Sequence, residues 1–159
     1  MRNSRMMRRA NQRGHALIEL AASAAVMVGC LAGTFQFGYT FYVYNQLVTA
    51  VGNGGRYAAM RTYRASAPSD IEKARAAIRN MVAYGDTRPA PGALPQVANL
   101  KPEQVQVEWV MDESGKPALV NVSIADYSVD AAFGMFRFIG KPAVEYPFVG
   151  RFAPSESEP

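Results

Sequence analysis

Residues 20–55 carry no charged side chain and read LAASAAVMVGCLAGTFQFGYTFYVYNQLVTAVGNGG. The run lies between Glu19 and Arg56 and therefore contains 36 consecutive uncharged residues. A bilayer core of about 30 Å is crossed by only about 20 helical residues. As one helix, the run would extend about 54 Å at about 1.5 Å per residue. The sequence thus predicts one membrane-spanning helix with several further turns beyond the hydrocarbon.

Two halves of this run differ in composition. Residues 20–31 are aliphatic and rich in alanine, whereas residues 35–44 contain six aromatic side chains. Aromatic residues are enriched at membrane–water interfaces, and they also suit a packed helix face. Polar residues return from Asn45 onward, which predicts that the helix leaves the hydrocarbon near this point.

Three ordinary kinds of segment compete to explain the run. A cleaved secretory signal could use Ala22-Ser23-Ala24 as its cleavage site, but the sequence stays apolar for about twenty residues beyond it. A lipoprotein signal could use Val28-Gly29-Cys30, but a lipidated cysteine is normally followed by a polar tether, and residues 31–51 are mostly apolar. An uncleaved single-pass anchor explains the whole run and leaves only Glu19 without a reason.

The charge of the chain is concentrated at its start. The 17 basic and 13 acidic residues sum to +4, yet residues 1–13 hold five arginines and no acid. The rest therefore has 12 basic and 13 acidic residues, a net charge of −1. Outside residues 1–13 there is thus no excess of positive charge that could bind along a phosphate backbone, so we expect no nucleic-acid partner.

The rarest residue types restrict the chemistry. The chain has one histidine, His15, and one cysteine, Cys30, which excludes an intrachain disulfide. A zinc site or a Ser-His-Asp or Cys-His arrangement needs more ligands or a histidine in a cleft. Carboxylate-only, lysine-based and Mg²⁺-dependent chemistry stays open, but no motif points to it, so we expect no catalytic residues, no metal site and no cofactor. A membrane-anchored hydrolase would need several acids that converge in a pocket.

Glu19 is the residue that a plain anchor does not explain. A carboxylate in a spanning helix costs about 2.5–3.5 kcal/mol on insertion scales, less near an interface, and such acids are usually paired. Glu19 follows Gly14 at a fixed distance: with Gly14 at −1, the segment His15 to Glu19 places the acid at +5. Basic leader, glycine and acid together resemble the processing site of class III signal peptides. This resemblance implies cleavage by a prepilin peptidase before His15, and pairing of Glu19 with the new amino terminus of a neighbouring subunit.

The resemblance extends through the apolar helix. Three segments are similar to the TadE-like family of minor pilins, or pseudopilins, of the Tad (type IVc) pilus: residues 34–39 (TFQFGY), 45–47 (NQL) and 50–59 (AVGNGGRYAA). The similarity to this family covers roughly residues 10–62. The family implies a long helix packed on a small exported domain, with prepilin peptidase, other pilin subunits, pilus platform proteins and the lipid bilayer as partners.

Beyond the long helix, the sequence predicts a second, shorter one. Ser69 and Glu72 have the spacing of a capping box, and Gly85 is placed to end the helix. Apolar residues recur at helical spacing and predict a core-facing stripe: Ile71, Ala74, Ala77, Ile78, Met81 and Val82. Residues 86–102 contain four prolines and predict an extended loop. The segment Gly52 to Gly55 predicts a helix break or tight helix packing rather than a nucleotide-binding loop.

The last part of the chain predicts a small antiparallel sheet. Apolar and polar residues alternate over 105–109 and 120–124, and turn residues at 112–117 favour a hairpin between them. Residues 131–139 predict a helical turn or an irregular plug. Residues 143–148 predict a third strand. Pro147 indicates that this strand either lies at an edge of the sheet or ends at the proline.

These expectations combine into an α+β fold with a long N-terminal transmembrane and stem helix, a second helix and a three-stranded or similar antiparallel sheet. We expect a leader over 1–14, the long helix over 15–62 and an exported domain over 63–159. The function expected is a structural minor pilin in the bacterial inner membrane, with a cytoplasmic N-terminus, that joins or primes a surface pilus for adhesion. The alternative is an uncleaved single-pass membrane protein with an envelope-side binding or scaffold domain.

Overall fold

The computed structural model describes residues 3–64, 68–131 and 134–153 of the chain. It confirms an α+β fold with a long N-terminal apolar helix, a second helix and antiparallel sheets. The chain forms two compact units, residues 1–39 and residues 40–159. In order, the elements are α1 (Asn3–Met60), β1 (Tyr63–Arg64), α2 (Pro68–Tyr84), the 3₁₀ turn η1 (Pro102–Gln104), β2 (Val105–Met111), β3 (Pro117–Ile124), β4 (Asp126–Ala131), β5 (Gly134–Ile139), β6 (Ala143–Pro147) and β7 (Phe152–Ala153).

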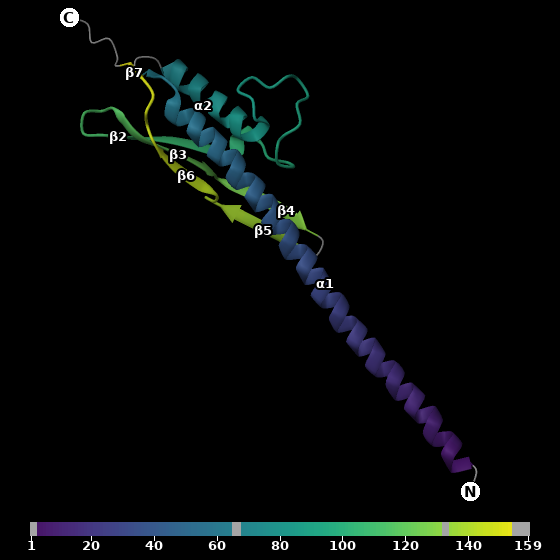
Figure 1. Ribbon diagram of the computed structural model, residues 1–159. Helices are drawn as coiled ribbons and strands as arrows, with labels where there is room; N and C mark the ends of the chain where they lie inside the picture. Colours follow the sequence, from purple (N-terminus) through teal and green to yellow (C-terminus); the bar gives the residue numbers. More distant parts are fainter. Residues whose placement is uncertain (1–2, 65–67, 132–133, 154–159) are drawn as a thin grey trace, which may run out of the picture. The chain divides into compact units, whose positions relative to one another are not determined.

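The second unit is built around a three-stranded antiparallel sheet in the order β2-β3-β6. The predicted hairpin is confirmed, with Val107 opposite Val122 and a turn between β2 and β3. Alternate residues of each strand face the core, and the two helices α1 and α2 cover this side of the sheet (Figure 1). The strand β6 lies at an edge and ends at Pro147, as the proline predicts.

Within this unit, α1 buries one side of its last five turns. The buried residues recur at intervals of three and four, the period that keeps side chains on one helix face: Val43, Leu47, Ala50, Val51, Gly54, Ala58. The helix runs through Gly52 to Gly55 without a break. Of the two roles predicted for this segment, tight packing is therefore the one that the structure shows.

Gly54 and Gly55 are where two other elements approach α1 most closely. A Cβ on Gly54 would overlap Cγ2 of Val82 on α2. A Cβ on Gly55 would lie 2.8 Å from ring atoms of Tyr146 and from Cγ2 of Val144, both on β6. The two glycines thus allow α2 and β6 to pack directly against the backbone of α1.

The second helix begins slightly earlier than predicted. It starts at Pro68, so Ser69 lies inside the first turn, and Glu72 accepts a hydrogen bond from the Arg75 guanidinium. The predicted capping box is therefore wrong, because the proline, which suits the first helical position, sets the start. The core stripe is confirmed: Ala74, Ile78 and Val82 are buried, and the helix ends before Gly85, which has a φ of 76°.

The described residues of the segment 131–139, namely Ala131 and 134–139, do not form the helical turn or plug predicted from its aromatic content. They belong to a second antiparallel hairpin, in which β4 pairs with β5 and Tyr127 lies opposite Phe138. Inward residues occur at every second position of β5, so Phe136 and Phe138 pack against the core. Phe133, the third aromatic residue of the segment, lies outside the described residues. Apolar residues on both faces of β5 hide the period of two that would identify a strand in the sequence.

The long loop and the end of the chain complete the unit. The proline-rich residues 86–101 form no helix or strand, as predicted, whereas Pro102 begins η1. A short parallel pair, β1 with β7, was not predicted, because each strand is only two residues long. In this pair Tyr63 lies opposite Phe152, and the hydrogen-bonded strands hold the end of the described chain next to the end of α1.

One ion pair on the β4–β5 hairpin makes folding sensitive to acid. Nε of Arg137 donates a hydrogen bond of 2.7 Å to Oδ1 of Asp126, and a second guanidinium N–H bonds to Oδ2. This hydrogen bonding lowers the pKa of the Asp126 carboxyl below its ordinary value of 3.8. A carboxyl with a depressed pKa in the folded state adds stability above its unfolded pKa, and this stability is lost as pH falls through the folded pKa.

We therefore expect the urea midpoint of the detergent-solubilised full-length protein to fall as the pH is lowered below about 4, where unfolded aspartate takes up its proton. Arg137→Gln should make this decline shallower, by a small amount because both side chains are largely exposed. Some decline should remain, since the pKa of Asp112 is lowered separately by the Ser114 hydroxyl and the Lys116 backbone N–H. Identical pH profiles for the two proteins would show that the pair contributes nothing.

Candidate processing and assembly segment

The three residues predicted to act in processing and assembly all lie near the start of α1. Gly14, His15 and Glu19 are helical and exposed. His15 and Glu19 are four residues apart, so they lie on the same face of the helix, one turn from each other. Around Gly14 there is open space, since a Cβ built there would have no heavy atom within 4 Å. An approaching protein can therefore reach the Gly14–His15 bond and the Glu19 carboxylate from the side.

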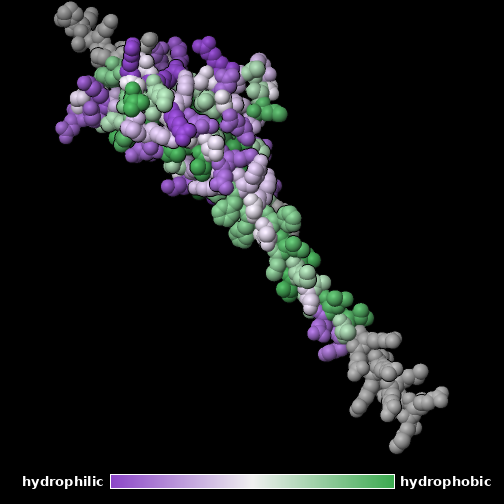
Figure 2. All heavy atoms as spheres, viewed as in Figure 1, coloured by the Kyte–Doolittle hydropathy of each residue, from purple (hydrophilic) through white to green (hydrophobic). Residues whose placement is uncertain are grey.

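The helix that follows these residues is apolar and uncovered. Among the described residues, one helical stretch, Gly14–Met60, is long and apolar enough to cross a membrane. Figure 2 shows the hydrophobic surface along this part of α1. Large side chains here are more than half exposed, among them Leu17, Ile18, Leu20, Val26, Met27, Val28, Leu31 and Phe35. A helix in the core of a water-soluble protein would bury such residues, so the exposed surface indicates membrane association.

One polar side chain within this segment, Thr34, is satisfied locally. The Thr34 hydroxyl donates a hydrogen bond of 3.0 Å to the backbone carbonyl of Cys30, one turn earlier. Such a bond lets a hydroxyl enter an apolar medium without an unpaired donor. The Cys30 thiol is exposed on the helix surface. Glu19 is thus the side chain in residues 19–55 that carries a formal charge into this surface.

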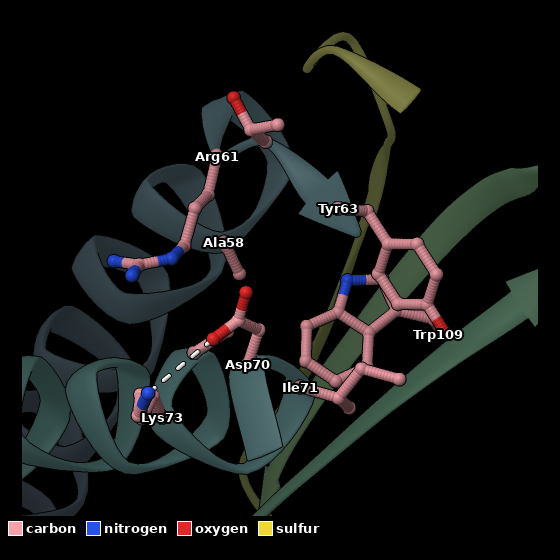
Figure 3. Close-up of a pocket in the computed structure, with 9 residues that line it drawn as sticks. Ala58, Arg61, Tyr63, Asp70, Ile71, Lys73 and Trp109 are labelled. Atoms are coloured by element: carbon pink, nitrogen blue, oxygen red, sulfur yellow. Dashed lines mark hydrogen bonds and ion pairs between the residues drawn. The ribbon is translucent and has the colours of Figure 1, made fainter. Parts of the chain in front are cut away.

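The folded unit contains a separate hollow that the sequence did not predict. Its volume is about 330 Å³, and it is lined by the end of α1, β1, the first turns of α2 and Trp109 of β2 (Figure 3). The Tyr63 and Trp109 rings meet edge to face with centroids 5.4 Å apart, and Nζ of Lys73 lies 3.4 Å from Oδ1 of Asp70. Among the described residues that line the hollow, Asp70 is the only acid.

The structure is that of a membrane-associated class of protein, in which a small α+β unit is joined to a long apolar helix with an exposed surface. Residues 14–56 match the family model described as TadE-like protein. This match confirms the TadE-like resemblance for the apolar helix, and it includes Gly14, His15, Glu19 and the glycines that pack against α2 and β6. No curated protein sequence and no solved structure matches the chain. The architecture of residues 57–159 therefore rests on the structure alone.

Proposed function

We propose that the protein is a minor pilin, or pseudopilin, associated with a Tad (type IVc) pilus. The observation that carries this proposal is the TadE-like match over an exposed apolar helix in which Gly14 and Glu19 have prepilin spacing. A membrane-inserted subunit needs such a helix to be uncovered, because the same surface meets lipid before assembly and other subunits afterwards.

Processing is the first step of the proposed function. A prepilin peptidase would hydrolyse the amide between Gly14 and His15, which leaves a carboxylate on the leader and an α-ammonium on His15. The five arginines of the leader favour a cytoplasmic N-terminus, since cytoplasmic flanks of spanning helices carry an excess of Lys and Arg. The folded unit then lies on the other side of the inner membrane. The other partners are pilin subunits, platform proteins and, in the surface pilus, the target of adhesion.

Mass spectrometry of the membrane-extracted protein tests this step. In a strain with an active prepilin peptidase, we expect a mature chain that begins at His15. Gly14→Leu should retain the leader, because its side chain would fill the open space next to the bond to be cut. Gly29→Leu is a matched control: Gly29 is also exposed on α1 with no heavy atom near its Cβ position, and processing should be unchanged.

An intact Met1 leader in the unsubstituted protein would refute the pilin function. It would favour the alternative, an uncleaved single-pass membrane protein whose folded unit binds a partner in the cell envelope. The hollow that Tyr63 and Trp109 help to line is the feature of the structure that such a binding module would use.

A further inference from the structure

The outer surface of the β4–β5 hairpin differs from the rest of the folded unit. The three-stranded sheet turns mainly polar residues outward, including Gln106, Glu108 and Glu145, with the exposed Val110 as an apolar exception. On β5, by contrast, apolar side chains occupy both faces: Phe136 and Phe138 pack inward, while Met135 and Ile139 point outward and are 70% and 69% exposed. A strand with one covered face normally alternates apolar and polar residues. The outward Met135 and Ile139 therefore indicate that the outer face of β5 also contacts an apolar surface, outside the folded unit.

The hairpin also lies at a particular end of its unit. The Phe138 ring packs against Tyr44, near the first turn of α1 in this unit, with centroids 5.3 Å apart. Figure 1 shows β4 and β5 beside these first turns, whereas β7 and the end of α1 lie at the opposite end of the unit. Two exposed aromatic residues, Phe41 and Tyr42, are on the same turns.

The length of α1 places these turns close to a bilayer. The folded unit begins at Thr40, so 25 residues, His15 to Tyr39, precede it after processing. As a helix they extend about 37 Å, and a common tilt of about 20° reduces their reach to about 35 Å. A bilayer is about 30 Å thick in its hydrocarbon core and about 40–45 Å with its headgroups. No helical spacer is left between the bilayer and residue 40.

We propose that Met135 and Ile139 rest on the bilayer at the boundary between headgroups and acyl chains, together with Phe41 and Tyr42. This inference rests on the proposed insertion of α1 in the membrane. The charges suit a shallow contact: Asp126 is neutralised by Arg137, and the exposed Asp130, opposite Met135 in the hairpin, keeps this surface at headgroup depth. Because the contact is apolar, it depends little on anionic lipid.

The single cysteine of the chain makes the test direct. In a Cys30→Ala background, Met135→Cys and Ile139→Cys are each labelled with an environment-sensitive fluorophore, and the full-length protein is reconstituted in phosphatidylcholine vesicles. A nitroxide lipid labelled near its headgroup quenches fluorophores at that depth. Matched controls are Leu94→Cys and Val110→Cys, which are exposed apolar positions elsewhere in the unit. A fifth sample carries the label on the native Cys30.

We expect quenching at 135 and 139 to exceed that at 94 and 110 by at least about twofold, since an interfacial segment is buried about 5–10 Å. Replacing part of the lipid with phosphatidylglycerol should leave the difference unchanged. Equal quenching at all four positions, with Cys30 still quenched by a nitroxide at acyl-chain depth, would overturn this proposal alone. A water-exposed Cys30 would overturn membrane insertion as well. A blue shift at 135 without quenching would show contact with protein, and would also overturn the lipid contact.

Discussion

Gly54→Ala is expected to destabilise the folded unit by about 1–3 kcal/mol, the usual cost of overpacking a closed core. The added Cβ would overlap Cγ2 of Val82, and both residues are buried. Val82 cannot turn away easily, because a β-branched side chain in a helix has one strongly preferred rotamer. Either α2 moves away from α1, or a strained rotamer is adopted. Urea denaturation of the full-length protein in detergent measures the change.

Gly55→Ala should act in the same direction through a different element. Its Cβ would lie 2.8 Å from the Tyr146 ring and from Val144, so β6 rather than α2 would have to move. Tyr146 is only partly buried and can shift more easily than Val82. We therefore expect a smaller loss of stability than for Gly54→Ala, with the same measurement.

The matched control for both variants is Gly52→Ala, on the same helix. The nearest atom to its Cβ position is the Tyr146 hydroxyl oxygen at 3.9 Å, an ordinary contact. Alanine is favoured over glycine inside a helix by about 0.5–1 kcal/mol, so this variant should be unchanged or more stable. If Gly54→Ala were stabilising by the same amount, the close approach of α2 to α1 would be refuted.

The segment 52–55 illustrates what sequence can and cannot predict. Four residues rich in glycine favour either a break or close packing, because the lack of a Cβ permits both. Which one occurs depends on Val82 and Tyr146, which lie far away in the chain and are brought to the glycines only by folding. The apolar helix itself was predictable, since its length and lack of charge are local properties. The same holds for the β2–β3 hairpin, whose alternation and turn residues are contiguous.

Predictions failed where short segments depend on distant partners. The strand β5 has apolar residues on both faces, so its period of two was hidden, and it was predicted as a turn or plug. The pair β1–β7 joins two-residue segments about ninety positions apart, for which sequence offers no periodic signal. The hollow beside Trp109 was missed for the same reason: its lining comes from four elements. For Gly14, His15 and Glu19, the structure shows exposure, while their roles remain predictions.

Glu19→Ala should reduce pilus assembly by about tenfold or more, if its carboxylate pairs with an α-ammonium in a low-dielectric layer. Breaking such a pair by removing one partner typically costs about 3–5 kcal/mol, and each 1.4 kcal/mol corresponds to about tenfold. Insertion of the single helix should persist or improve, because the acid itself opposes insertion by up to about 2.5–3.5 kcal/mol. Immunoblots of sheared pili and of the membrane fraction separate the two effects.

Ser23→Ala is the matched control, since Ser23 is exposed on the same helix face one turn beyond Glu19. Its assembly should equal that of the unsubstituted protein. Glu19→Gln keeps the size and hydrogen-bonding capacity of the side chain without its charge, and should be as defective as Glu19→Ala. Normal pili from either Glu19 variant would remove this carboxylate from the mechanism.

Combining Glu19→Ala with Gly14→Leu identifies the partner. If Glu19 acts through the amino group that processing creates on a neighbouring His15, a subunit that keeps its leader offers no such group. Assembly of the double variant should then equal that of Gly14→Leu alone, because two changes that remove the same interaction are not additive. A further loss in the double variant would mean that Glu19 binds some other group, either in the lipid or on a different subunit, and would separate processing from the role of this acid.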